Sequence, residues 1–300
     1  MPSKTAVIIN ASAGCGYTDA WATGLAQKFS AYGLDVHVTL AHSGAELIKA
    51  ARQAVARRCS IVVAGGGDGT INAVASVLVG TDVCLGVLPL GTLNHFAKDL
   101  GVPLTLDAAI HAIATGSSIQ VDTGEVNGRL FLNNSSLGLY PDIVRDRERQ
   151  QRRLGRGKWL AFLWATMAAL RRYPFLEAQL HLNGMAHRIR APFIFIGNNH
   201  YSMEGFNIGE RDCLDRGELS LYVAHRTGRL GLLVLATHAL LGRLKQVKDF
   251  NILLAKEVLI ETRHTRMRVA TDGEVTVMPT PLRYRLRPRS LRVIVPVAAA

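Results

Sequence analysis

The sequence predicts an α/β plus β protein, with an N-terminal doubly wound α/β nucleotide-binding domain and a C-terminal antiparallel β-sandwich domain. Three observations predict this architecture. Strand-like and helix-like patterns alternate from the N-terminus to about residue 115, which is typical of parallel strands joined by helical crossovers. A glycine-rich turn follows one of those strands. From about Asp122 onward, strand-like runs follow one another, as they do in antiparallel sheets.

Short β-branched runs, separated by longer helix-like stretches, define the elements of the first part. The predicted strands are Ala6–Asn10, Val36–Leu40, Ile61–Ala64 and Cys84–Leu88, and the predicted helices are Thr18–Tyr32, Gly44–Arg57 and Ile71–Val79. In a sheet that is wound in this way, ligands bind at the carboxyl ends of the strands.

The second part consists of short strand-like runs with two helical insertions, around Asp142–Tyr173 and around Arg229–Arg243. The predicted strands are Thr123–Val126, Arg129–Asn133, Ala178–Leu182, His187–Arg190, Phe193–Ile196, Leu219–Ala224, Lys256–Thr262, Arg266–Thr271 and Leu291–Val295. Asn183-Gly184, between two of these strands, predicts a hairpin turn. This half is therefore expected to be an antiparallel sheet or sandwich.

Four glycines, Gly65, Gly66, Gly67 and Gly69, follow the predicted strand Ile61–Ala64. Each interior glycine costs roughly 0.5–1 kcal/mol of stability relative to alanine, so the four together forfeit about 2–4 kcal/mol. A tight turn between a strand and a helix would need only one or two of them. Phosphate recognition explains the others, because N–H groups without a neighbouring Cβ can approach anionic oxygens at the start of a helix. The loop is therefore predicted to bind a nucleotide.

Composition favours a folded protein with an anionic partner. Of the 300 residues, 48% are hydrophobic, and 35 Lys and Arg outnumber 23 Asp and Glu, which gives a formal charge of +12. Nucleotides, nucleic acids and acidic membrane surfaces are the partners that such a charge attracts. The four cysteines form no CxxC pair, and neither a secretory signal nor an apolar span of about 20 residues is visible. We therefore expect a cytoplasmic protein with reduced thiols.

The glycine loop is the first of several motifs that together resemble the diacylglycerol kinase catalytic-domain family, which includes bacterial lipid kinases and sphingosine kinases. The motifs are Gly66–Thr70, Leu88–Ala97, Leu100–Pro103, Phe131–Leu139, Ile196–Asn199 and Asp272–Glu274. Their order and spacing agree with that family over nearly the whole chain. The glycine loop alone is less specific, since NAD kinases and phosphofructokinases carry similar loops.

The resemblance implies three segments. Residues 1–121 would form the ATP-binding domain, residues 122–285 the β-sandwich domain for the lipid substrate, and residues 286–300 a segment that returns to the first domain. It also implies transfer of the γ-phosphate of ATP, with Mg²⁺, to the hydroxyl of diacylglycerol or a related long-chain lipid alcohol. The sequence does not identify the lipid, and it does not distinguish ATP from GTP.

The nucleotide contacts that the resemblance implies lie in the glycine loop and near the ends of neighbouring strands. They are Thr39, Gly65, Gly66, Gly67, Asp68, Gly69, Thr70, Asn72, Thr92 and Asn94. From the residues alone, Thr70 would cap the following helix or meet a phosphate. Asp68 would orient the loop, bind Mg²⁺ or stabilise a turn.

The other polar residues of this set keep two interpretations. Thr39 and Thr92 are ATP contacts by resemblance, and each would otherwise be an ordinary turn threonine. Asn94 would either touch the ligand or organise the site, and Asn72 would equally suit a solvated helix position. The pattern alone does not choose between these roles.

Asp272-Gly273-Glu274 places two carboxylates on a tight turn after a predicted strand. One carboxylate could accept the proton of the acceptor hydroxyl while the other holds Mg²⁺ or orients that acceptor. By resemblance, Glu274 is the expected proton acceptor and Asp272 its close partner. A simple turn between two strands would use the same residues without catalysis.

A second magnesium-binding loop of the family departs from its pattern in this chain. Where relatives carry Asp-Asp-Gly, this chain carries Asp215-Arg216-Gly217, so a guanidinium replaces one acid. Asp68 and Asp215 are the metal ligands that we predict, and the departure places the second ion in question. Asp212, Asp215 and Glu218 could still form a variant site, or Arg216 could replace the ion by forming a salt bridge.

The segment 145–173 combines a basic run with an apolar helix-like stretch. Arg145–Lys158 carries seven positive and two negative charges in fourteen residues, and Trp159–Met167 follows it directly. Such a pattern fits peripheral contact with an anionic membrane surface. A solvated charge run before a core helix is the alternative.

Three other functions are compatible with parts of the sequence. An NAD kinase shares the glycine loop, although its ribose-binding Asn-Glu segment is not apparent. A non-catalytic lipid- or nucleotide-binding regulator is compatible with Arg216, although Asp272 and Glu274 argue against it. We expect no nucleic-acid partner, because no recognised module or interleaved aromatic pattern is present. The sequence allows a homodimer and does not predict one.

Overall fold

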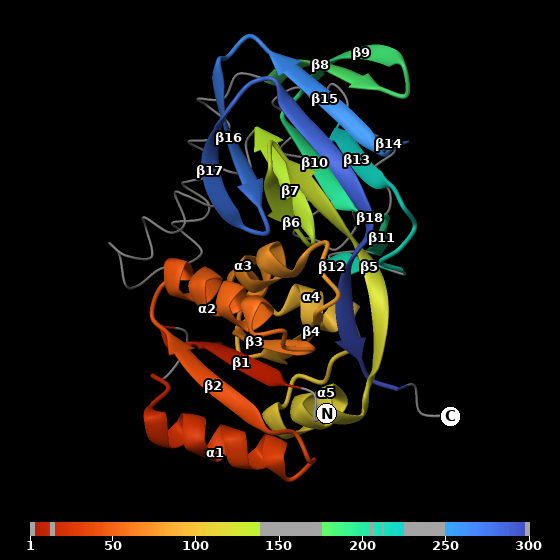
Figure 1. The fold of residues 1–300 in the computed structure, drawn as a ribbon. Coiled ribbons are helices and arrows are strands. Elements are labelled where there is room, and N and C mark those ends of the chain that lie inside the picture. Colours follow the sequence, from red (N-terminus) through yellow and green to blue (C-terminus); the bar gives the residue numbers. More distant parts are fainter. Residues whose placement is uncertain are drawn as a thin grey trace, which may run out of the picture. The chain divides into compact units, whose positions relative to one another are not determined.

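A computed structural model of the protein describes residues 4–12, 16–138, 176–204, 207–211, 213–224 and 250–297. The chain forms two compact units (Figure 1). Unit 1 comprises Met1–Thr123, Cys213–Asp215 and Arg287–Ala300, and unit 2 comprises Gly124–Asp212 and Arg216–Leu286. The predicted helical insertions, 142–173 and 229–243, lie outside the described residues.

Unit 1 is built on a parallel sheet. Its strands are β1 (Thr5–Asn10), β2 (Val36–Ala41), β3 (Ile61–Gly66) and β4 (Cys84–Pro89). They lie in the order β2-β1-β3-β4, and every neighbouring pair is parallel. The C-terminal part of β18 (Leu282–Val295) also pairs with β4 in parallel.

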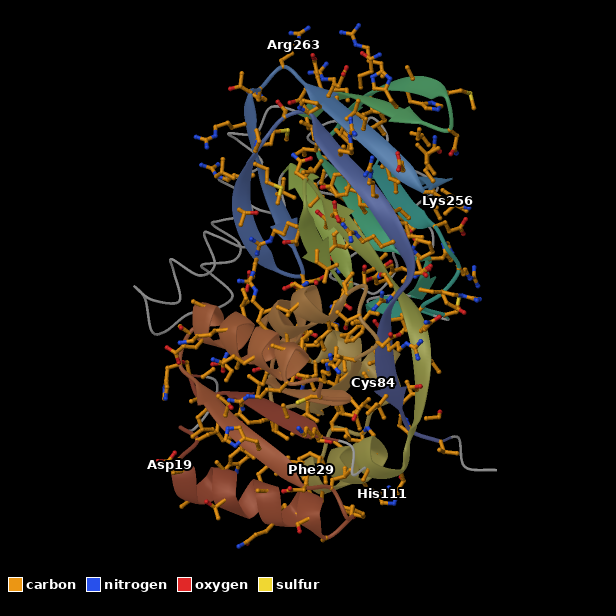
Figure 2. The ribbon with its side chains drawn as sticks, in the orientation of Figure 1. Asp19, Phe29, Cys84, His111, Lys256 and Arg263 are labelled. Carbon is orange, nitrogen blue, oxygen red and sulfur yellow. The ribbon has the colours of Figure 1, made fainter. Side chains whose placement is uncertain are left out.

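Helices cover both faces of this sheet, as the alternating pattern predicts (Figure 1). They are α1 (Asp19–Ser30), α2 (Gly44–Ala56), α3 (Asp68–Leu78), α4 (His95–Asp99) and α5 (Leu106–Thr115). Helices α1 and α5 lie on one face, and α2 and α3 lie on the other. The inner face of α1 contributes Phe29, which is fully buried (Figure 2).

The starts of α1 and α2 follow from local sequence. The Thr18 hydroxyl accepts a hydrogen bond from Trp21 N, and the Ser43 hydroxyl accepts one from Glu46 N. The Glu46 carboxylate in turn accepts from His42 N, one residue before the N-cap, in an arrangement that resembles a capping box. Hydrogen bonds from the His42 backbone and the Ser43 hydroxyl lower the pKa of Glu46.

Unit 2 contains two antiparallel arrays of strands. One has the order β14-β13-β10-β7-β16-β17, and its strands are β7 (Asn134–Gly138), β10 (Phe193–Asn198), β13 (Leu219–Ala224), β14 (Phe250–Ala255), β16 (Arg266–Thr271) and β17 (Glu274–Pro279). The other has the order β18-β15-β8-β9, with β8 (Leu176–Leu182), β9 (Met185–Ala191) and β15 (Glu257–Thr262). The remaining strands are β5 (Ser117–Val126), β6 (Arg129–Phe131), β11 (Tyr201–Glu204) and β12 (Asn207–Arg211).

The core of unit 2 shows that the two arrays form a sandwich. One buried cluster joins Leu137 and Ile196 of the first array to Leu180, Ile260 and Tyr284 of the second. The predicted fold class, a doubly wound domain followed by an antiparallel sandwich, is therefore confirmed. Within the described residues, no helix is long and apolar enough to cross a membrane.

Several element boundaries differ from the sequence prediction. Helix α3 begins at Asp68, three residues before the predicted Ile71, because the glycines end β3 at Gly66 and the helix follows almost at once. Helices α4 and α5 and strands β14 and β17 were not predicted. The predicted strand Arg129–Asn133 ends at Phe131, and a new strand begins at Asn134. The predicted Asn183-Gly184 turn is confirmed, since both residues have the positive φ of such a hairpin.

Candidate active site

The turn from β3 to α3 presents a helix start without a side-chain cap. Gly67 occupies the N-cap position, and no side chain accepts a hydrogen bond from the first turn there. The buried face of α3, with Ile71, Val74 and Leu78, fixes this helix against unit 1. The first N–H groups of a helix have no partner within the helix, and the helix dipole makes this end positive. The turn therefore suits an anion.

The glycines of this turn have different reasons to be glycine. A Cβ on Gly65 would lie 2.3 Å from Ile9 Cδ1, and one on Gly66 would lie 2.5 Å from Thr70 Oγ1. These two positions are closed by the protein itself. A Cβ on Gly67 would meet only Gly91 Cα, at an ordinary 3.5 Å. A tight turn was expected to need only one or two of the four glycines, and internal packing accounts for two of them, Gly65 and Gly66.

A second loop, between β4 and α4, packs directly on the first. A Cβ on Gly91 would lie 2.4 Å from Gly67 Cα, so the two main chains touch. Asn94 is buried, with a left-handed backbone, and its side chain accepts from Gly91 N and donates to Pro89 O and Gly91 O. Asn94 therefore organises this loop, which is one of the two roles predicted for it.

Asp68 links the two loops. One of its carboxylate oxygens accepts a hydrogen bond from Phe96 N at 3.1 Å. The carboxylate thus stands at the start of α3 and holds the start of α4 beside it. This contact corresponds to the predicted role of orienting the loop. Thr92, in the same loop, is exposed.

Thr70 does not cap α3. Its hydroxyl accepts from Asn10 Nδ2 at 2.9 Å, and its side chain is buried. Asn10 was not predicted as a site residue, although a polar residue at the carboxyl end of β1 is a usable signal. Thr39 lies two residues before the end of β2, opposite Ile8, and Asn72 lies in the second turn of α3. Unit 1 thus gathers Asn10, the glycine loop and the Asn94 loop at the carboxyl ends of β1, β3 and β4.

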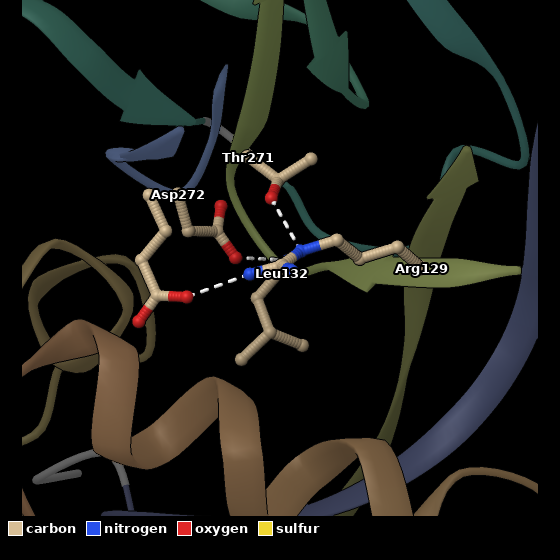
Figure 3. Close-up of polar contacts among 5 residues, drawn as sticks. Arg129, Leu132, Thr271 and Asp272 are labelled. Carbon is tan, nitrogen blue, oxygen red and sulfur yellow. Dashed lines mark hydrogen bonds and ion pairs between the residues drawn. The ribbon is translucent and has the colours of Figure 1, made fainter. Parts of the chain in front are cut away.

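In unit 2, the predicted acidic turn joins β16 to β17. Asp272 and Gly273 both have positive φ, 47° and 84°, which is the geometry of a tight two-residue hairpin. The Asp272 carboxylate accepts hydrogen bonds from three consecutive N–H groups, Leu132 at 2.7 Å, Asn133 at 2.9 Å and Asn134 at 3.0 Å. Figure 3 shows the contact with Leu132. Asp272 therefore anchors the hairpin to the segment between β6 and β7.

Glu274 is held by an arginine that was not predicted. Arg129 Nη2 lies 2.6 Å from Glu274 Oε2, and Arg129 Nε donates to Thr271 Oγ1 at 3.0 Å (Figure 3). The Glu274 side chain is 61% exposed, so its carboxylate is accessible to a substrate. The two acids of the motif are therefore distinct: Asp272 is engaged by the backbone, and Glu274 faces solvent beside a guanidinium.

A buried arginine supports the segment that receives Asp272. Arg211 donates to Leu132 O, Asn198 O and Asn133 Oδ1, and Asn198 Nδ2 also donates to Leu132 O. Leu132 and Asn133 belong to the motif Phe131–Leu139, and Asn198 belongs to the motif Ile196–Asn199. The sequence left the role of both motifs open. Their side chains position the loop that the acidic turn grips. Arg211 itself had no recognisable signal in the sequence.

The predicted metal ligand Asp215 lies beside a cationic side chain. Asp215 lies 3.9 Å from Arg289 Nη2, and the buried Asp122 accepts from Arg289 N at 2.7 Å. Across the described part of the chain, no three His, Cys, Asp or Glu residues gather as metal ligands. The guanidinium of Arg289 thus stands beside Asp215, and the salt bridge expected of Arg216 stays a prediction. The metal role predicted for Asp68 stays a prediction, and its single carboxylate is compatible with Mg²⁺ shared with phosphates, since such ions need only one or two carboxylates.

Comparisons with family models assign both parts of the chain. The model of the diacylglycerol kinase catalytic domain matches residues 4–126. The model of the YegS C-terminal NAD kinase beta sandwich-like domain matches residues 142–295. Together they cover the doubly wound unit and the sandwich.

Curated relatives match more modestly. An uncharacterized protein of Synechocystis is 28% identical over 244 residues, 79% of this chain and 55% of that protein. Two proteins named "Probable lipid kinase YegS-like", from Klebsiella pneumoniae and Yersinia pestis, are 37% and 36% identical over 108 and 110 residues. These two matches cover 35% of this chain and 36% and 37% of those proteins. The chain thus spans about half, or less, of the length of these relatives.

Among solved structures, a diacylglycerol kinase from Bacillus anthracis superposes with a TM-score of 0.76 at 24% identity. The match covers 99% of this chain and 98% of that one. At this identity the likeness establishes the fold.

Proposed function

Since the chain belongs to the diacylglycerol kinase catalytic-domain family, we propose that it is an ATP-dependent lipid kinase. It transfers the γ-phosphate of ATP to the hydroxyl of diacylglycerol or a related long-chain lipid alcohol. The observation that carries this proposal is the uncapped start of α3 at Gly67, within the matched catalytic domain. That start offers main-chain donors and no Cβ at the point where an anion would bind.

Unit 1 is proposed to bind the nucleotide. The triphosphate would approach Gly67 and the first turn of α3, where the positive helix end stabilises anionic oxygens. Asn10 and Thr70 form a polar pair at the same edge of the sheet, and the exposed Thr92 lies on the adjoining loop. Asp68 would hold Mg²⁺ at the phosphates, and the ion would supply charge neutralisation for transfer.

Unit 2 is proposed to hold the acceptor. Glu274 would accept the proton of the lipid hydroxyl as that oxygen attacks phosphorus, because its carboxylate is exposed and held in one orientation. Arg129 fixes that orientation by binding both Glu274 and Thr271. Asp272 contributes by anchoring the hairpin from which Glu274 projects.

The decisive experiment incubates the purified protein with γ-labelled ATP, Mg²⁺ and mixed micelles that contain one candidate lipid at a time. Label is expected in a phospholipid product when diacylglycerol or a related long-chain alcohol is present. A parallel incubation replaces the micelles by NAD, because the sandwich matches a domain named for its likeness to NAD kinase. Label in NADP and not in any lipid would overturn the proposal.

A further inference from the structure

One end of unit 2 gathers the termini of many strands. In the six-stranded sheet, β16 begins at Arg266 opposite Pro279, the last residue of β17. Gly138, at the end of β7, pairs with Phe193, at the start of β10. Ala224, at the end of β13, pairs with Phe250, at the start of β14. Because the register links each pair to its neighbour, all six termini share this end.

The second sheet contributes termini to the same end. Leu176, the first residue of β8, pairs with Ala191, the last of β9, and Thr262, the last of β15, pairs with Ala178. Residues 263–265 join β15 directly to β16, so the ends of both sheets meet there. Hydroxyls of Thr262 and Thr280 donate to His264 O and hold this turn in place.

Four arginines mark this end: Arg190, Arg263, Arg266 and Arg268, which we call the arginine end. All four are exposed, and Arg263 lies at the tip of the turn, where its side chain is 80% exposed (Figure 2). Two glutamates on the adjoining strands are already paired. Glu177 lies 3.7 Å from Arg263 and 3.9 Å from Arg190, and Glu261 lies 3.3 Å from His181. Positive charge therefore predominates at this end.

Apolar side chains alternate with the arginines. Arg268 pairs with Val277 across the hairpin, and Val277 is 56% exposed. Arg266 pairs with the exposed Pro279. An arginine can lay its aliphatic stem along apolar surface while its guanidinium meets phosphate. This combination fits the interface of a bilayer, where apolar side chains enter the headgroup layer and basic ones meet anionic lipids.

Both long gaps in the described part of unit 2 begin and end at residues of this end. The described chain stops at Gly138 and resumes at Leu176, and it stops at Ala224 and resumes at Phe250. All four residues lie at the end just defined. The sequence 145–173, for which we predicted membrane contact, lies outside the described residues and is joined to the structure here.

We propose that the arginine end of unit 2 binds the anionic phospholipid headgroups of a membrane surface. Binding would be governed by charge, since each arginine near such a surface adds attraction that falls off within a Debye length. The inference concerns membrane docking and stands whether or not the proposed kinase activity is correct.

The test measures binding of the full chain to vesicles of equal parts phosphatidylcholine and phosphatidylglycerol, and to vesicles of phosphatidylcholine alone. The key variant carries Arg263→Gln, Arg266→Gln and Arg268→Gln. Its affinity for the anionic vesicles is expected to fall about a hundredfold, from roughly fivefold for each of the three arginines. A second variant, with Arg263→Lys, Arg266→Lys and Arg268→Lys, retains the positive charge. It is expected to bind the anionic vesicles nearly as the wild type does.

A matched control removes the same charge elsewhere. Lys49→Gln, Arg52→Gln and Arg57→Gln change three exposed residues in and directly after α2 of unit 1, and this variant is expected to bind like the wild type. Circular dichroism and thermal unfolding confirm that each variant is folded. Equal losses in both glutamine variants would show that only net charge matters and would overturn the proposal. Unchanged binding of the key variant to anionic vesicles would overturn the proposal as well. So would a key variant that loses affinity for RNA but keeps its affinity for the vesicles.

The rate of phosphorylation of a soluble short-chain diacylglycerol tests the proposed kinase activity separately from membrane docking. The key variant is expected to phosphorylate it as fast as the wild type, because the arginine end contains no residue of the candidate active site. A wild type that binds anionic vesicles but phosphorylates no lipid would refute the kinase proposal and leave the docking surface intact.

Discussion

At the scale of single residues, the site depends on which atoms already have partners inside the protein. A Cβ on Gly65 or Gly66 would force the side chain of Ile9 or Thr70 to shift, whereas a Cβ on Gly67 would have room. Asp272 is held by three backbone N–H groups, whereas Glu274 is exposed and paired with Arg129. Residues that are close in sequence and alike in chemistry thus have different structural roles.

Substitutions in the glycine loop should separate binding from folding. Gly67→Val is expected to weaken ATP affinity by about tenfold to a hundredfold, the equivalent of one lost hydrogen bond to a charged group. Gly67→Ala should leave the free energy of unfolding within about 0.5 kcal/mol of the wild type, since its Cβ has room. Gly65→Ala should lower that free energy by about 1–3 kcal/mol through overpacking on Ile9. Calorimetric titration and chemical denaturation measure the two quantities, and wild-type ATP affinity in Gly67→Val would contradict the phosphate-binding role.

The proton-accepting role of Glu274 predicts a loss of turnover without a loss of nucleotide binding. Glu274→Gln is expected to reduce kcat by about 10²–10⁴, the usual contribution of a positioned base, with the Kd for ATP unchanged. Arg129→Met should also lower kcat, and Arg129→Lys should restore part of it, because a cation beside Glu274 is retained. Steady-state kinetics on the lipid substrate measures these effects. Full activity in Glu274→Gln would exclude the role.

At the scale of elements, one side chain joins two hairpins. The Asp272 carboxylate, on the turn between β16 and β17, accepts from the main chain that leads from β6 into β7. Arg211 and Asn198 hold the carbonyl side of that same segment. The hairpin that carries Glu274 is therefore positioned by backbone contacts rather than by its own turn alone.

Asp272→Asn tests this anchoring. The amide has one acceptor oxygen, and its NH₂ group would face N–H donors, so at least one buried donor would lose its partner. The free energy of unfolding should fall by about 1–3 kcal/mol. Glu274→Gln is the matched control, and the loss of its exposed ion pair should cost about 0–1 kcal/mol. Urea denaturation compares the two variants, and equal stabilities would show that Asp272 is not an anchor.

At the scale of the whole molecule, the chain forms two compact units, and strands β5 and β18 contribute residues to both. The core of unit 2 encloses polar groups as well as apolar ones. Tyr284, in the half of β18 that belongs to unit 2, is fully buried, and its hydroxyl lies 3.0 Å from Ser135 Oγ. Burial raises the pKa of Tyr284 well above its usual value, against a smaller lowering by the Ser135 hydrogen bond.

This buried phenol predicts alkaline sensitivity. Its folded-state pKa is raised, so the stabilisation that it contributes is complete below the unfolded-state pKa of about 10 and is lost as the pH rises above it. The free energy of unfolding should fall by up to about 1.4 kcal/mol per pH unit in that range. Tyr284→Phe should show a shallower fall, and Tyr32→Phe, which changes an exposed tyrosine, should match the wild type. Identical slopes in all three proteins would refute the prediction. Burial also raises the pKa of Tyr222. The free energy of unfolding of Tyr284→Phe should therefore still fall somewhat as the pH rises.

The sequence by itself determined the fold class, the strand of the glycine loop, the Asn183-Gly184 hairpin and the acidic turn, because these features arise from local periodicity and backbone sterics. Only the tertiary structure decided that Arg129 holds Glu274 across 145 residues and that Asp272 grips Leu132 across 140. It also decided that Arg190 of β9 shares one end with Arg263, Arg266 and Arg268 of the β15–β16 turn and β16. Contacts between segments so distant in sequence depend on strand register and packing, and no local pattern of residues encodes them.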